Sequence, residues 1–163
     1  EFIDAVFHTE PPMSAAEQRE AFQSALGDGL GEACTVEVVQ AIHEQLLDRI
    51  NRHRESKDPE PLEITAGDVS AILRDCGVDE QAVQGFQTQC RTLLGEGGLN
   101  PANLIDPRRF ELKTEAASVT VDPERSYLVE LRELDGRKYL LVPADGGVTV
   151  NGLPLGTAPA HPA

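Results

Sequence analysis

His43 and Glu44 come nearest, by residue type and spacing, to a catalytic or metal-binding pattern. On a helix they begin the HExxH pattern of zinc proteases, in which two histidines four residues apart reach one metal ion. Position 47 holds Leu, so the second ligand is absent. His53 cannot replace it, because it lies about 15 Å further along such a helix. Both imidazoles fall on the apolar side of the helix, and we expect them at a core edge or a subunit contact.

Three cysteines are the next candidates, because a thiolate is both a nucleophile and a metal ligand. Cys76 and Cys90 fall in the apolar stripes of adjacent predicted helices, where a thiol packs as a small hydrophobe. Cys34 precedes a predicted helix, a position that can lower the pKa of a thiol, although Glu32 and Glu37 oppose this effect. An odd number of cysteines without a CxxC pair argues against a disulfide framework and favours a reducing compartment.

Glycine-rich and nucleophile motifs are incomplete. Gly27, Gly29 and Gly31 follow a predicted helix, whereas a dinucleotide-binding fingerprint follows a strand and opens a helix. The chain has neither the GxSxG elbow of esterases nor a P-loop. A metal-binding hypothesis rests only on scattered His and Cys residues. The sequence therefore predicts no catalytic residue, no cofactor-binding residue, no metal ligand and no cofactor.

Residues 65–94 have the layout of a helix-turn-helix, with a later hairpin in the place of a wing. A recognition helix approaches phosphates with its N-terminal residues, and this one would begin at the acidic Asp79. The nearby cations Arg74 and Arg91 are isolated, and Arg108 lies with Arg109 on a connector. A helical hairpin that serves only for packing explains the same residues, so we do not expect DNA binding.

The charge balance also argues against DNA binding. The chain has 28 acidic and 14 basic residues, a formal net charge of −14. Such a surface repels polyanions, so we expect neither nucleic acid nor an anionic membrane as a partner. No apolar run approaches the ~20 residues that span a bilayer, and no signal peptide is recognisable. We expect a cytoplasmic protein, and we interpret the start without Met, inside a predicted helix, as the edge of a longer protein.

The periodicity of hydrophobic residues changes near residue 106. Before it, apolar residues recur at helical spacing, and capping boxes at Ser14 with Glu17 and at Thr65 with Asp68 mark two helix starts. Leu62–Ile64 is compatible with one short strand. The predicted helical segments are an opening helix with Phe2, Ile3, Val6 and Phe7, then 14–26, ended by its glycines, 36–54, 65–76, 79–94 and a single turn at 100–105.

From Phe110 the period becomes two, which is typical of strands. Asp122-Pro123 favours a type I turn, and the two-residue hairpin signals Asp135-Gly136 and Asn151-Gly152 follow. The first of these joins a predicted strand at Tyr127–Leu134 to the next one. Its register pairs Leu134 with Arg137 and gives one apolar face. The pairs expected on that face are Leu131 with Leu140 and Val129 with Val142.

Several long strings carry a resemblance to a known family. The runs HEQLLDRINRHRESKDPEPLEITAGDVSAILRDCGVDE, NLIDPRRFE, VDPERSYLVE, DGRKYLLVPADGGVTVNG and EPPMSAAEQREAFQSALGDGLGE resemble the C-terminal portion of an uncharacterised bacterial domain-of-unknown-function family. The resemblance implies longer intracellular proteins of anaerobic Gram-positive gut bacteria. It also implies that an upstream portion is missing here. It implies no substrate, cofactor or catalytic residue.

The sequence thus predicts an α+β protein. We expect about five helices in residues 1–106, packed on an antiparallel sheet of four or five strands in 107–155 that shares their core, and a disordered tail at 156–163. Two independent domains are the alternative. We expect a non-enzymatic interaction or structural module that docks on the upstream region, another protein or a second copy. The alternative function is a wall or lid of an enzyme whose catalytic residues lie upstream.

Overall fold

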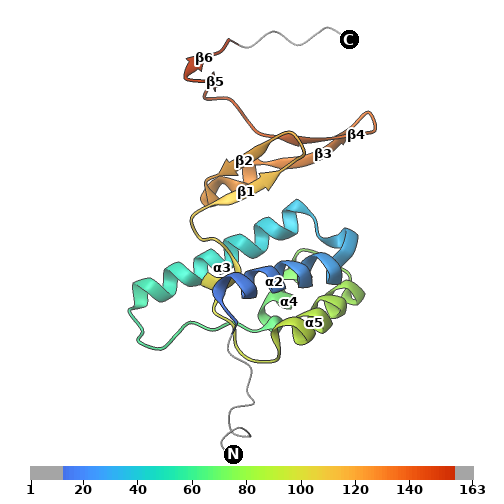
Figure 1. Ribbon diagram of the computed structural model, residues 1–163, viewed down its shortest axis with the longest axis vertical. Helices are drawn as coiled ribbons and strands as arrows, with labels where there is room; N and C mark the ends of the chain where they lie inside the picture. The colour runs from blue at the N-terminus through green and yellow to red at the C-terminus, as the bar shows by residue number, and fades with distance from the viewer. Residues whose placement is uncertain (1–12, 157–163) are drawn as a thin grey trace, which may run out of the picture. The chain divides into compact units, whose positions relative to one another are not determined.

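The computed structural model describes residues 13–156 of the chain, so the predicted opening helix and most of the predicted disordered tail lie outside the described residues. Helices come first and strands follow, as predicted for an α+β protein (Figure 1). The helices are α2 (Ala15–Leu30), η1 (Gly31–Ala33), α3 (Val36–Ser56), α4 (Ala66–Asp75), α5 (Glu80–Leu94), α6 (Pro101–Leu104) and the 3₁₀ helix η2 (Pro123–Leu128). The strands are β1 (Phe110–Lys113), β2 (Ser118–Val121), β3 (Glu130–Leu134), β4 (Arg137–Leu141), β5 (Thr149–Val150) and β6 (Leu153–Pro154).

Both predicted capping boxes are present. The Ser14 hydroxyl accepts from the Glu17 amide at 3.1 Å, and the Glu17 carboxylate accepts from the Ser14 amide. Thr65 and Asp68 make the same pair of bonds at 3.1 and 2.8 Å. Each box satisfies two amides that have no partner within a helix, which fixes the first residue of α2 and α4. Asp79, the predicted start of the helix that becomes α5, is its N-cap residue, and its side chain makes no capping hydrogen bond.

α2 is longer than predicted, because Gly27 and Gly29 lie inside it and only Gly31, at φ 56°, ends it. Gly29 has a packing role instead. A Cβ atom added there would lie 2.5 Å from the Phe86 Cα on α5, and one added at Gly85 would lie 2.6 Å from the Gly29 carbonyl oxygen. The two glycines therefore let the backbones of α2 and α5 approach each other more closely than any side chain permits.

One apolar core lies among the helices. Its centre is fully buried, and the Phe22 and Phe86 rings meet edge to face at 6.1 Å. Ile64 forms a single antiparallel bridge with Leu99 rather than a strand. The buried core residues are Phe22, Ala25, Leu26, Leu30, Val38, Ile42, Leu46, Ile50, Ile64, Val69, Ile72, Leu73, Val83, Phe86, Cys90, Leu104 and Ile105.

The strands form three separate antiparallel pairs, β1 with β2, β3 with β4 and β5 with β6, rather than one sheet of four or five strands. The predicted register is confirmed where the β3–β4 ladder runs, since Leu134 pairs with Arg137 and Leu131 with Leu140. Val129 precedes the ladder, because η2 occupies the start of the predicted strand Tyr127–Leu134. The Asn151-Gly152 hairpin is confirmed too.

The chain divides into two compact units, Glu1–Ser126 and Tyr127–Ala163, here called the N-terminal and C-terminal units. The division falls after β2, not near residue 106 where the hydrophobic period changes. On the predicted apolar hairpin face Val129 is buried, whereas Leu131 and Val142 are 53% and 49% exposed. A two-stranded ribbon has no second layer of its own to cover it. A core shared by the helical and β regions stays a prediction.

Candidate functional site

The structure separates the sequence candidates. His43 is buried on α3, while His53 is partly exposed ten residues later and bonds through Nε2 to the Glu60 carbonyl at 2.7 Å. Within residues 13–156, no group of three or more His, Cys, Asp or Glu side chains that could hold a metal ion was found. The histidines therefore do not converge on a shared site among the described residues.

All three cysteines are free. Cys90 is buried in the core as predicted, and burial raises the pKa of its thiol to about 12. Cys76 is exposed at the C-terminal end of α4, so its predicted place in the core is wrong. Burial also raises the pKa of Cys34, which is opposite in direction to the lowering that a helix start can produce.

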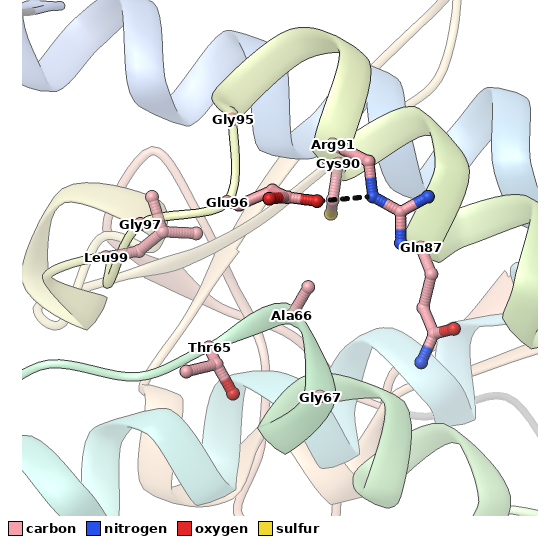
Figure 2. A pocket seen from close by; sticks show the side chains of 10 residues that line it. All are labelled: Thr65, Ala66, Gly67, Gln87, Cys90, Arg91, Gly95, Glu96, Gly97 and Leu99. Carbon is pink, nitrogen blue, oxygen red and sulfur yellow. Dashed lines mark ion pairs between the residues drawn. The ribbon is translucent and has the colours of Figure 1, made fainter.

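One pocket lies beside Cys90 (Figure 2). Its volume is about 270 Å³, and the Cys90 side chain is among those that line it. The Arg91 guanidinium and the Glu96 carboxylate form an ion pair at 3.0 Å on one side, and Thr65 and Gly67 at the start of α4 lie on the other. A protonated thiol is a poor nucleophile, so the raised pKa argues against Cys90 as a nucleophile.

A second pocket, of about 300 Å³, lies within the N-terminal unit and is lined by α2, α3 and the segment from α6 into β1. We call it the His43 pocket. α2, α3 and β1 each contribute both apolar and polar or charged residues to its lining. The lining residues are Arg19, Phe22, Gln23, Leu26, Val39, Ile42, His43, Leu104, Ile105, Asp106, Arg109, Phe110 and Glu111.

His43 is held firmly in this pocket. Its Nε2 lies 2.8 Å from the Asp106 carbonyl oxygen, which can only accept, so Nε2 carries the proton and donates. The Phe110 ring meets the imidazole edge to face at 5.4 Å. The other ring nitrogen, Nδ1, is buried and has no hydrogen-bond partner among the described residues. In a neutral ring with the proton on Nε2, Nδ1 is an acceptor.

Arg19 approaches the same connector from α2. Its Nη2 donates to the Ile105 carbonyl oxygen at 2.9 Å, next to the carbonyl that His43 binds. Its Nε is buried and, in the part of the chain that the structure describes, has no hydrogen-bond partner. The sequence reading missed Arg19, although it stands three residues before Phe22 on the apolar stripe of α2, where an arginine is out of place.

The remaining cation of the His43 pocket, Arg109, lies near two carboxylates. Arg109 lies 3.6 Å from the Asp106 carboxylate and 3.7 Å from the Glu111 carboxylate. Arg109 belongs to the basic pair that was predicted to lie on a connector. It forms ion pairs with neighbouring residues of its own segment. The Arg74 guanidinium likewise makes two 2.9 Å bonds to Glu80, which lowers the pKa of that carboxyl.

A family model described as Domain of unknown function (DUF4317) matches residues 1–153. The chain belongs to this family. The match spans the N-terminal unit and runs into the C-terminal unit as far as β6, so the DUF4317 sequence pattern includes both. No curated protein and no solved structure matches the chain. In the described part of this DUF4317 chain, no helix has the length and apolar character needed to cross a membrane.

Proposed function

We propose that this DUF4317 chain is a non-enzymatic structural or protein-interaction module of the cytoplasm. We further propose that the C-terminal unit carries its contact surface and that a second copy of the chain is the partner. The support is the distribution of exposed apolar side chains. Of the eleven large hydrophobic residues exposed in the described structure, ten lie in the C-terminal unit. They are Tyr127, Leu128, Leu131, Leu134, Tyr139, Val142, Val148, Val150, Leu153 and Leu155.

We call this set the hairpin surface. It lies on the β3–β4 and β5–β6 ribbons and beside them, and Leu131 and Leu134 are on opposite faces of the first ribbon. Monomeric proteins rarely leave large apolar patches in water, and isolated two-stranded hairpins are only marginally stable. Leu153 is 65% exposed, and its partner in the β5–β6 ladder, Val150, is 50% exposed. Burying such side chains against a protein surface stabilises the complex by about 1.5–3 kcal/mol for each leucine or valine that becomes fully covered.

Charge favours a second copy as the partner. Residues 127–163 hold four acidic and three basic side chains, a net charge of −1, whereas residues 1–126 hold 24 and 11, a net charge of −13. Like charges across an interface oppose association. Two identical chains therefore repel least where their C-terminal units meet. An interface of this kind is isologous, since the same patch serves both copies.

The test is sedimentation equilibrium of the 163-residue chain over a range of concentrations. We expect a monomer–dimer equilibrium that Leu131→Lys and Leu153→Lys each weaken by about tenfold or more, because each removes an apolar contact and adds a charge. Both positions are exposed, so the melting temperature of the dilute monomer stays nearly unchanged.

The matched control is Thr120→Lys, which adds the same charge at an exposed strand position of the N-terminal unit and leaves the dimer intact. A wild-type chain that stays monomeric at every concentration contradicts the proposal. In that case the hairpin surface is covered within the chain or by a different protein, such as the upstream region. Dimers that all three variants weaken equally also contradict it, because they place the contact elsewhere.

A further inference from the structure

We propose that the His43 pocket binds a small apolar molecule that carries a hydroxyl group. The pocket combines two features that point to a ligand and that the packing of the N-terminal unit leaves unexplained. One is the apolar wall of Phe22, Leu26 and Ile42 beside a volume of about 300 Å³. The other is a pair of buried polar atoms, one on His43 and one on Arg19, without partners among the described residues.

The two buried atoms define the chemistry of the ligand. The His43 Nδ1 is an acceptor and lacks a donor, whereas the Arg19 Nε–H is a donor and lacks an acceptor. A hydroxyl group is the simplest group that donates one hydrogen bond and accepts another. A carboxylate accepts from Arg19 but offers no donor to His43, and the carboxylates of Asp106 and Glu111 already line the pocket.

Because both atoms are buried, a ligand that forms hydrogen bonds with them gains binding free energy. His43 is only 6% exposed, so its side chain is more than nine-tenths buried. A buried polar group without a partner costs about 1–3 kcal/mol, and a ligand that supplies the partner recovers that cost. Because the two nitrogens are shielded, the hydroxyl reaches them only when side chains of the pocket wall change rotamer.

Other parts of His43 and Arg19 are already fixed, which pre-organises the site. The Asp106 carbonyl holds Nε2, the Phe110 ring packs edge-on against the imidazole, and the Ile105 carbonyl holds the Arg19 Nη2. Neither side chain needs to be ordered when the ligand binds, so little conformational entropy is lost at these two residues.

The experiment compares three probes of nearly equal shape by two-dimensional ¹⁵N–¹H NMR titration of the 163-residue chain. 4-Methylphenol donates and accepts at its hydroxyl, 4-methylanisole only accepts, and toluene does neither. We expect 4-methylphenol to bind about tenfold more tightly than 4-methylanisole, the factor that corresponds to one hydrogen bond to a buried acceptor. The shifted amide signals should belong to the elements that line the His43 pocket.

Two variants locate the binding. Gln at position 43 can keep the bond to the Asp106 carbonyl through its Nε2, but its acceptor Oε1 does not occupy the position of Nδ1, so His43→Gln should reduce the preference for 4-methylphenol over 4-methylanisole. His53→Gln is the matched control, because His53 also binds a backbone carbonyl through Nε2 but lies outside the pocket, and it should change nothing. Arg19→Lys, which removes Nε and keeps the charge, should also weaken binding.

Two results overturn the proposal, and the wild-type chain alone can give either. Equal affinity for the three probes means that the pocket selects apolar volume and not a hydroxyl group. If no probe binds, a trapped water and not a ligand satisfies the two nitrogens.

Discussion

At the scale of single residues, the three thiols differ in what surrounds them. Cys90 is 1% exposed in the core, Cys34 is partly buried, and Cys76 is exposed. Burial raises the pKa of all three, and for Cys76 the neighbouring carboxylate of Asp75 adds to the effect. Since the thiolate is the reactive form, access to solvent decides which thiol reacts first.

We predict that a disulfide reagent at pH 8 modifies Cys76 fastest in the folded chain and reaches Cys90 only through unfolding. The pKa of Cys90 rises on folding from 9.0 to about 12, so the folded state favours the protonated thiol. Its contribution to stability is complete below pH 9 and is lost as the pH rises toward 12. Mass spectrometry of the labelled cysteines checks the order, and Cys76→Ser should abolish the fast phase. Rapid labelling of Cys90 in folded protein would contradict it.

His43 shows how far one position can be predicted from sequence. The missing second histidine at position 47 and the apolar side of the helix predicted an imidazole at a core edge or a subunit contact, and in the structure His43 is buried. Its bond to Asp106 joins residues 63 positions apart, and no local pattern specifies such a pair. The involvement of Arg19 was missed for the same reason, because tertiary packing brings α2 to this connector.

At the scale of elements, the backbones of α2 and α5 approach each other closely at Gly29 and Gly85. A glycine inside a helix normally weakens it by about 1 kcal/mol relative to alanine. Here the lost helix propensity is offset by close packing of the two backbones, and the adjacent Phe86 is fully buried.

We predict opposite effects for alanine at two glycines of the same helix. Gly29→Ala should lower the free energy of unfolding by about 2–3 kcal/mol, because its Cβ would lie 2.5 Å from backbone atoms of Phe86 and the helices must separate. Gly27→Ala has nothing within 4 Å and should raise it by up to about 1 kcal/mol. Urea denaturation of both variants measures the difference. A neutral Gly29→Ala would show that α2 and α5 can move apart freely.

Local signals predicted the helix starts well and the strand assembly less well. A capping box involves residues three apart, so the starts at Ser14 and Thr65 could be predicted from their own neighbourhood. The hairpin register at Asp135-Gly136 is local in the same sense. Whether hairpins join into one sheet depends on contacts between distant segments, and alternation of apolar residues does not encode it.

At the scale of the whole molecule, charge and apolar surface are separated along the chain. The N-terminal unit encloses its own core and carries almost all of the net charge, while the C-terminal unit is nearly neutral and exposes the hairpin surface. The change of hydrophobic period near residue 106 therefore predicted the class of secondary structure on each side. It did not predict the unit boundary, because β1 and β2 belong to the N-terminal unit.

Hydrogen–deuterium exchange of the 163-residue chain at a low and a high protein concentration tests the contact surface most directly. If a second copy covers the hairpin surface, backbone amides within residues 127–155 exchange more slowly at high concentration, and those of α2–α5 exchange at the same rate in both samples. Identical exchange at the two concentrations throughout residues 127–155, or added protection confined to the helices, would contradict the account.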